Sequence, residues 1–235
     1  MREDMRKALL RSYDLRIEAE EIQIERGVVD VGFRSQVTSG KHLDEIAAII
    51  SEDLMSMGVS EDRIFYKNKD TEIPGWFRAT KQWDILAFSD DQLITAVELK
   101  SISSSFGNNL NNRTEEAVGE AIDAKFASDR GLLNRVIPPL FAYALIVRKN
   151  EESSSLCKKP NSHHFQPDEA FMSATYLDRF RIMCERLRRE NIYGAVWFVV
   201  VDPDASEVSE PVKELSYEAF LKEIEGHVGA FAATR

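Results

Sequence analysis

The stretch "KQWDILAFSDDQLITAVELKS", residues 81–101, places charged side chains inside two runs that otherwise have the composition of core strands. The polar turn "SDDQ" between the runs predicts an antiparallel pair. Asp84 lies near the start of the first strand, and Glu98 and Lys100 lie in the second. Because unpaired carboxylates are costly inside a buried sheet, these residues require a chemical explanation.

The alternation of side chains along a strand places Glu98 and Lys100 on one face and Leu99 on the other. Neighbouring strands lie about 4.8 Å apart, so Asp84 can reach the same face. Two carboxylates suit Mg²⁺, which binds through one or two of them and keeps several waters. A lysine beside them can orient a water or offset charge in a phosphoryl transition state. The arrangement predicts Mg²⁺-dependent hydrolysis of a DNA phosphodiester.

The bare spacing is a weak signal, because a solvated ion pair between Glu98 and Lys100 on an edge strand explains it equally well. Asp123 and Lys125 form the same acid-x-Lys pattern elsewhere in the chain. They fall in a predicted helix, where residues two apart do not share a face. The apolar neighbours of Glu98 indicate a buried sheet and therefore favour the site.

The composition permits one substantial hydrophobic core, since the chain has 235 residues, of which 43% are hydrophobic. We expect a single domain over 1–235, in which N-terminal helices at about 1–60 pack on a catalytic core at about 61–201, with a helix at the C-terminus. Cys157 and Cys184 have no CxxC spacing and are expected to be free thiols.

The charge and hydropathy patterns limit the classes of function. No run reaches the roughly 18 apolar residues of a membrane helix, and the charged N-terminus is unlike a signal peptide, so we expect no membrane partner and a cytoplasmic location. The formal net charge of −10 argues against nucleic-acid binding in general. A local basic groove can nevertheless coexist with an acidic back surface.

Hydrophobic periodicity predicts the remaining elements. Helices are expected at 2–26, 38–57, 113–128, 167–189 and 216–228, and strands at 62–67, 83–88, 93–100, 140–147 and 193–201. Asn112 is expected to cap the helix at 113–128, and Gly58 to end the one before it. Residues 149–168 are expected to form a long loop. The order predicts an α/β fold with a mixed central sheet flanked by helices.

Polar residues on both sides of the proposed site are candidates for DNA contact, because amide and guanidinium groups pair with base edges and phosphates. After the catalytic strand they are Asn108, Asn109, Asn111, Asn112 and Arg113. Before it they are Arg78, Lys81 and Gln82. The alternatives are turn and cap formation for the asparagines, and ordinary solvation for the cations. Trp76 and Phe77 could stack on bases, although such aromatic residues are more often core.

The segments "GWFRATKQWDILAF" and "AVELKSISSSFGNNLNNRTEEAVGEAID" together resemble the XhoI-type family of type II restriction endonucleases, in the PD-(D/E)xK nuclease superfamily. The resemblance covers roughly residues 70–125, about a quarter of the chain. Its most specific block is "SFGNNLNNRTEEA". Trp83 stands where the superfamily name has Pro, a position that carries no ligand.

The resemblance implies a restriction-endonuclease-like core in which Asp84 and Glu98 bind the metal, with Lys100 as the catalytic lysine. It also implies that the backbone carbonyl of Leu99 is a further metal ligand. Glu45, on the helix at 38–57, is a candidate for an additional contact, and an exposed helix glutamate is the alternative.

The family resemblance also implies partners and substrate. Its members are homodimers that cleave both strands of double-stranded DNA with Mg²⁺, without an organic cofactor, at the palindrome CTCGAG, and here the site is that hexamer or an extended version of it. The alternatives are another nuclease of this superfamily, acting in repair or recombination, and a DNA-binding module that has lost catalysis. Retention of both carboxylates and the lysine argues against the last alternative.

Overall fold

A mixed six-stranded sheet forms the centre of the protein in a computed structural model, which describes all residues except 14–40, 68–69, 135–136, 161 and 234–235. In spatial order its strands are β1 (Ile64–Tyr66), β4 (Ile85–Ser89), β5 (Gln92–Ile102), β6 (Leu140–Arg148), β7 (Ala195–Asp202) and β8 (Glu207–Ser209). The strands β1, β4 and β5 pair antiparallel, β5, β6 and β7 pair parallel, and β8 is antiparallel to β7. The predicted α/β class, mixed sheet and antiparallel meander are confirmed.

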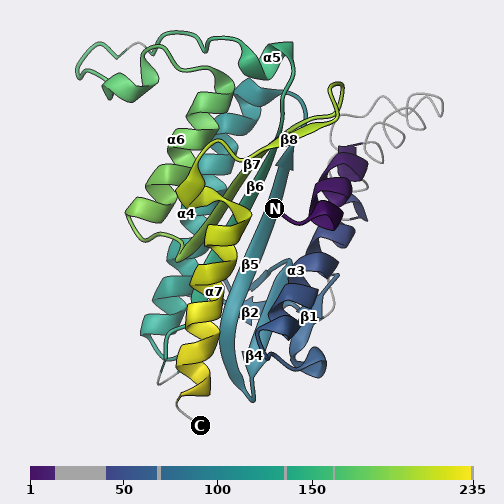
Figure 1. The fold of residues 1–235 in the computed structure, drawn as a ribbon. Coiled ribbons are helices and arrows are strands. Elements are labelled where there is room, and N and C mark those ends of the chain that lie inside the picture. The colour runs from purple at the N-terminus through teal and green to yellow at the C-terminus, as the bar shows by residue number, and fades with distance from the viewer. Residues whose placement is uncertain (14–40, 68–69, 135–136, 161, 234–235) are drawn as a thin grey trace, which may run out of the picture.

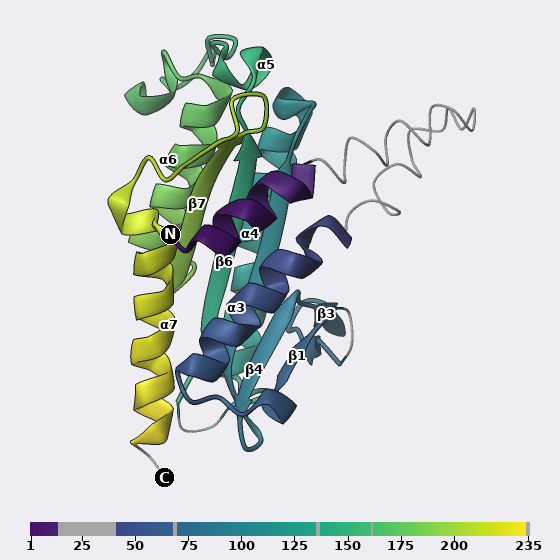
Figure 2. The ribbon, with the colours of Figure 1, turned by 45° about the vertical axis from the view of Figure 1, so that its right-hand side comes forward.

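Helices cover both faces of this sheet (Figures 1 and 2). One face carries α3 (Asp44–Ser56), α7 (Tyr217–Ala232) and the helix at 3–13. The other face carries α4 (Phe106–Asp129) and α6 (Tyr176–Arg189). Each face has its own cluster of buried apolar side chains, so the sheet separates two cores.

Strand β5 contributes to both cores because its side chains alternate. Val97 and Leu99 are buried among α3, α7 and their neighbours, whereas Ala96 and Ile102 are buried beneath α4 and α6. Strand β6 is likewise buried on both faces, as expected for the inner strands of a parallel sheet. A polar side chain on the α4 side of β5 is therefore held inside the molecule.

A second, two-stranded sheet lies beside the main one and was not predicted. It pairs β2 (Glu72–Pro74) with β3 (Thr80–Gln82) in a short hairpin. Each strand is only 3 residues long, too short for a periodic signal in the sequence. The amide of Trp83 donates to the carbonyl of Thr71 at 2.9 Å and closes the base of the hairpin.

Helix α4 begins at Phe106, so the predicted start near Arg113 with an Asn112 cap is wrong. The N-cap is Ser105, whose backbone is left-handed with φ of 54°. Phe106 and Leu110 are buried in the core, and this packing makes the asparagine-rich stretch helical. Packing thus overrides the loop-forming preference of that composition.

Other boundaries differ in smaller ways. Helix α6 begins at Tyr176 behind a capping box of Thr175 and Asp178, later than predicted, and the expected loop at 149–168 contains the short helix α5 (Glu151–Ser154). The remaining short helical turns are η1 (Lys41–Leu43), η2 (Glu61–Arg63), η3 (Glu169–Phe171) and η4 (Lys213–Leu215).

At the N-terminal end of the chain, Gly58 follows α3 with φ of 97°, as predicted for a helix end. The predicted N-terminal helix lies outside the described residues beyond residue 13. In the described ranges, none of the helices combines the length and apolar character needed to cross a bilayer.

Candidate active site

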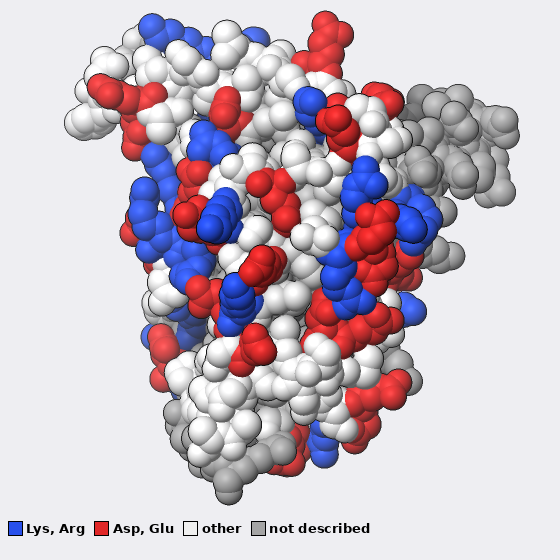
Figure 3. All heavy atoms as spheres, in the orientation of Figure 1, with Lys and Arg blue, Asp and Glu red and all other residues white. Residues whose placement is uncertain are grey.

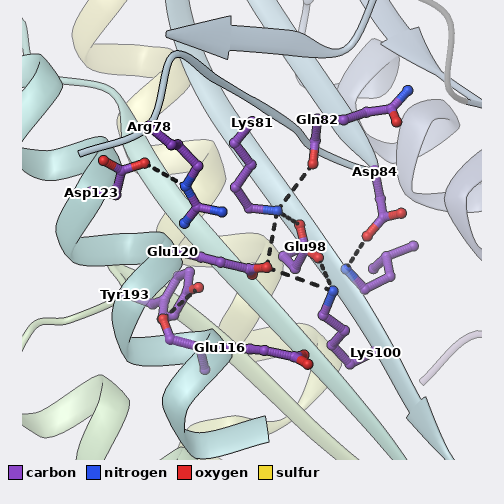
Figure 4. Close-up of polar contacts among 12 residues, drawn as sticks. Arg78, Lys81, Gln82, Asp84, Glu98, Lys100, Glu116, Glu120, Asp123 and Tyr193 are labelled. Atoms are coloured by element: carbon purple, nitrogen blue, oxygen red, sulfur yellow. Dashed lines mark hydrogen bonds and ion pairs between the residues drawn. The ribbon is translucent and has the colours of Figure 1, made fainter. Parts of the chain in front are cut away.

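Asp84, Glu98 and Lys100 come together where β4 begins beside the middle of β5 (Figure 4). The amide of Asp84 donates to the carbonyl of Val97 at 3.1 Å. The amide of Leu99 in turn donates to Oδ2 of Asp84 at 2.6 Å. The pairing of two neighbouring strands therefore brings the aspartate to the side of β5 that carries the glutamate and the lysine.

Glu98 is the buried centre of this cluster, with 3% of its surface exposed. Lys81 Nζ donates to its Oε2 at 2.8 Å, and Lys100 Nζ donates to its Oε1. The Lys81 ammonium also lies 4.8 Å from the centre of the Trp83 ring. Two ammonium groups offset the cost of burying the carboxylate, which would be large if it were unpaired.

Glu120 of α4 completes the cluster and is not among the residues predicted for the site. Its Oε1 lies 3.3 Å from Lys81 Nζ and 4.0 Å from Lys100 Nζ. Its Oε2 is buried without a hydrogen-bond partner among the described residues. The sequence contains a signal that points to this residue. Glu116, Glu120 and Asp123 recur at helical spacing beside buried alanines, and this spacing places their side chains on the side of the helix that faces the sheet.

The electrostatic environment perturbs the ionisable groups of the cluster. Burial and the charge of Glu98 raise the pKa of Asp84 to about 7, against the opposing effects of the Leu99 amide and the two lysines. Burial and the same glutamate also raise the pKa of Glu120. Burial lowers the pKa of Lys100, but the two glutamates outweigh it and the net shift is upward. Such strong perturbation is typical of functional sites.

The β2–β3 hairpin is fixed to α4 by Asp123. The Oδ1 of this aspartate accepts from the amides of Trp76 at 2.8 Å and Phe77 at 2.6 Å, and Oδ2 accepts from Arg78 Nε at 2.7 Å. Burial by itself would raise the pKa of Asp123, but these hydrogen-bond donors have the larger effect and the net pKa is lowered. A Cβ on Gly75 would overlap with this carboxylate, so the close approach requires glycine.

The aromatic residues of the hairpin are exposed, so the alternative that they belong to the core is wrong. Trp76 is 45% and Phe77 is 70% exposed. The hairpin lies over the outer side of α4, where the guanidinium of Arg130 is 4.1 Å from the centre of a Trp76 ring and the rings of Phe77 and Phe126 are 5.5 Å apart. One side of each aromatic ring therefore remains available to solvent.

The three polar residues before β4 have different environments. The Arg78 side chain is paired with Asp123 and 43% exposed. Lys81 is inside the cluster, with its side chain 9% exposed. Gln82 is exposed, and its side-chain amide points away from the Lys81–Glu98 contact (Figure 4). Only Lys81 joins Asp84 and Glu98.

The asparagines lie on the first turns of α4. Asn108, Asn111 and Asn112 are exposed there. Asn109 has a local role, because its Nδ2 donates to the carbonyls of Ser104 at 2.9 Å and Ser105 at 3.2 Å. The next candidate along the helix, Arg113, pairs with Glu116 at 2.7 Å. Asn109 therefore stabilises the start of the helix through carbonyl contacts, without acting as its N-cap.

The oxygen donors of the cluster are of the kind that holds Mg²⁺. Asp84 and Glu98 offer carboxylate oxygens, and Glu120 Oε2 is a buried oxygen without a partner in the described structure. The side chain of Leu99 is buried on the opposite face. Among the described residues, no three His, Cys, Asp or Glu side chains are close enough to form a complete metal cluster.

Other candidate residues lie away from the cluster. Glu45 pairs with Arg11 on the opposite face of the sheet, with its side chain 44% exposed. Cys157 and Cys184 are both free thiols, as predicted.

The face that carries α7 and α3 has Lys, Arg, Asp and Glu interspersed (Figure 3).

The chain is similar to known restriction enzymes. The family model described as restriction endonuclease XhoI matches residues 22–211. Type II restriction enzyme BstVI of Geobacillus stearothermophilus is 32% identical over 213 residues, which cover 87% of this chain and 94% of the relative. Type II restriction enzyme XhoI of Xanthomonas vasicola is 37% identical over 158 residues, covering 66% and 63%. Type II restriction enzyme AbrI of Azospirillum brasilense is 33% identical over 162 residues, covering 68% and 72%. No solved structure matches.

The matched region includes the whole Asp84, Glu98, Lys100 and Glu120 cluster, the hairpin that supplies Lys81, and all six strands of the central sheet. Because the family model matches well over half of the residues and a relative is similar along nearly its full length, the chain belongs to the XhoI family of type II restriction endonucleases.

Proposed function

We propose that this site-specific deoxyribonuclease hydrolyses phosphodiester bonds of double-stranded DNA in a Mg²⁺-dependent reaction at a palindromic site, CTCGAG or an extended version of it. The observation that carries the proposal is the convergence of Asp84, Glu98 and Lys100 from two paired strands. Buried carboxylates that face an ammonium and one another have no structural advantage over apolar residues at the same positions. Their chemistry therefore explains their presence.

Each residue has a distinct task in the proposed reaction. Asp84, Glu98 and the backbone carbonyl of Leu99 hold Mg²⁺, which supplies stabilisation of the attacking and leaving oxygens when it is bound. The Leu99 amide fixes the orientation of the Asp84 carboxylate through its 2.6 Å hydrogen bond. Lys100 keeps its proton and orients the attacking water while offsetting the charge that develops on the phosphate.

Recognition of the DNA sequence is proposed to fall to the first turns of α4. Asn108, Asn111 and Asn112 are exposed there, directly after the strand that carries the site. Amide side chains pair with adenine, and the guanidinium of Arg113 pairs with guanine. Arg78, Lys81 and Gln82 complete the proposed DNA-binding set, with the cations near the phosphates that flank the scissile bond. Asn109, whose amide donates to the carbonyls of Ser104 and Ser105, is not included.

The proposed assembly is a homodimer in the cytoplasm. A palindromic site has two-fold symmetry, and two copies of the chain related by a two-fold axis can present one cluster to each strand. No organic cofactor is included in the proposal. A repair or recombination nuclease on the same fold is the remaining alternative, and a DNA-binding module without catalysis is disfavoured by the intact cluster.

Digestion of a plasmid of known sequence, with and without Mg²⁺, tests the proposal when the fragment ends are sequenced. We expect discrete ends at one palindrome, and only when Mg²⁺ is present. Scattered ends would favour the non-specific nuclease alternative, and equal cutting in a chelator would remove the metal from the reaction. The Glu98→Ala protein serves as the control for contaminating nuclease, because it should leave the plasmid intact.

A further inference from the structure

Both oxygens of Glu98 already face ammonium groups, Oε2 that of Lys81 and Oε1 that of Lys100. A cation that approaches Glu98 therefore meets an ammonium group at either oxygen and is repelled by it. Lys100 comes from the same strand, two residues away, and its place is set by the alternation of β5. Lys81 comes from the separate β2–β3 hairpin and has a second carboxylate beside it, Glu120.

We propose that Lys81 and Glu120 act as a positioning pair. In the metal-free site the Lys81 ammonium lies against Glu98. When a divalent metal binds Glu98, this ammonium moves to Glu120. The inference rests on the proposed metal site but adds two residues and a role to it. It assigns neither residue to the chemical step.

The Lys81 ammonium has only a short distance to move between the two carboxylates. Lys81 Nζ lies 2.8 Å from Glu98 Oε2 and 3.3 Å from Glu120 Oε1, so a small rotation of the lysine side chain moves it from one carboxylate to the other. The backbone of the hairpin need not move, because Asp123 holds the loop of the hairpin against α4. Figure 4 shows the ammonium between the two glutamates.

The state of Glu120 fits this role. Its Oε2 is buried without a partner in the described residues, so the carboxylate has an unused acceptor. A buried carboxylate gains from each charge-assisted hydrogen bond it receives. A lysine that leaves Glu98 therefore meets a group that still needs a donor. Without Glu120, the same lysine has only Glu98 to neutralise and competes with the metal more strongly.

A double-mutant cycle on cation binding tests the pair. Wild type, Lys81→Met, Glu120→Gln and the double variant are titrated with Mn²⁺ in the absence of DNA, and free Mn²⁺ is measured by electron paramagnetic resonance. We expect Lys81→Met to tighten binding at least about tenfold and Glu120→Gln to weaken it by a similar factor. In the Lys81→Met background, the Glu120→Gln effect should be at least about threefold smaller, because no competing ammonium remains.

The outcomes separate this inference from the proposed function. If Glu120→Gln weakens Mn²⁺ binding by the same factor in both backgrounds, the two residues act only as nearby charges and the positioning pair is refuted. If the wild type binds no Mn²⁺, both the pair and the proposed metal site fail. Normal wild-type binding with independent effects of the two substitutions overturns the pair alone.

Thermal stability gives a second readout that needs no tight binding. Lys81→Met should lower the Tm of the metal-free protein, and saturating Mg²⁺ should raise its Tm more than that of the wild type. Lys81→Gln, which keeps a hydrogen-bond donor without the charge, should change Mn²⁺ affinity in the same direction and guards against a folding defect. Glu218→Gln and Lys222→Met are matched controls, because this exposed ion pair lies on α7 across the sheet and should alter neither readout.

Discussion

The amide of Leu99 donates a 2.6 Å hydrogen bond to Oδ2 of Asp84, linking the residue before β4 to the middle of β5. This bond favours the charged form of the aspartate, yet burial and the charge of Glu98 are stronger, and the pKa of Asp84 rises to about 7. The metal-free site therefore holds an acid that is protonated at mildly acidic pH and charged above neutrality. Burial of this charge therefore destabilises the folded state increasingly as the pH rises.

Asp84→Asn should make the metal-free protein more stable than the wild type at alkaline pH. The folded pKa of about 7 lies above the ordinary aspartate pKa of 3.8, so the folded state binds more protons than the unfolded state between these two pH values. Stability conferred by the protonated form is lost as the pH rises through this window. Between pH 5 and pH 8 the wild type loses about 2.6 kcal/mol of stability in this way, and the Asn variant, which does not titrate, loses none of it.

Chemical denaturation in a chelator, followed across pH, measures this difference. The two proteins should be similar near pH 5 and diverge as the pH rises. A constant difference at every pH would show that Asp84 does not titrate with a raised pKa.

Lys100→Ala should abolish cleavage while leaving specific DNA binding largely intact. Its ammonium is proposed to act on the water and on the developing phosphate charge, so its loss is expected to lower the cleavage rate by on the order of 10³-fold. Single-turnover cleavage and gel-shift titration of the same duplex measure the two properties. Lys222→Ala, which removes an exposed lysine of α7, is the control. Comparable cutting by Lys100→Ala would exclude the lysine from the reaction.

Asp123→Ala should release the β2–β3 hairpin from α4. The substitution removes the acceptor for the Trp76 and Phe77 amides and for Arg78, which is worth about 3 kcal/mol for a buried carboxylate of this kind. Hydrogen exchange at the two amides should accelerate by on the order of 10²-fold, because each 1.4 kcal/mol corresponds to a factor of ten.

Gly75→Ala provides an independent way to disturb the same contact, since its Cβ would overlap with the Asp123 carboxylate. It should also accelerate exchange in the hairpin and slow DNA cleavage, because Lys81 belongs to that hairpin. Gly119→Ala on α4 is the matched control, as its Cβ would meet open space. Unchanged exchange in both Asp123→Ala and Gly75→Ala would show that the hairpin is held by other contacts.

Asn111→Ala and Arg113→Ala should weaken binding to cognate DNA much more than binding to random DNA. Contacts to base edges contribute about 1–3 kcal/mol of discrimination, whereas phosphate contacts weaken both kinds of binding alike. Asn109→Ala is a useful comparison, because its amide is engaged with the carbonyls of Ser104 and Ser105. It should change helix stability more than sequence preference. An equal loss on both DNAs would identify Asn111 and Arg113 as phosphate contacts.

The sequence by itself determined the strands, their faces and the main partners in the cluster. Strict alternation along 93–100 places Glu98 and Lys100 on one side, because the side-chain period of a strand is two. The turn "SDDQ" determines that the preceding strand returns beside it, which brings Asp84 to the same place. Each of these inferences needs only neighbours along the chain.

Long-range packing selects which distant residues join them. Lys81 reaches Glu98 because a short hairpin docks on Asp123, and Glu120 reaches both because α4 packs its buried alanines against the sheet beside β5. The Lys81 contact has no local sequence signal, since the hairpin strands are too short for periodicity, and the helical spacing that directs Glu120 toward the sheet does not identify its partners. Burial of the apolar side chains around them decides both contacts, and burial is a property of the assembled fold.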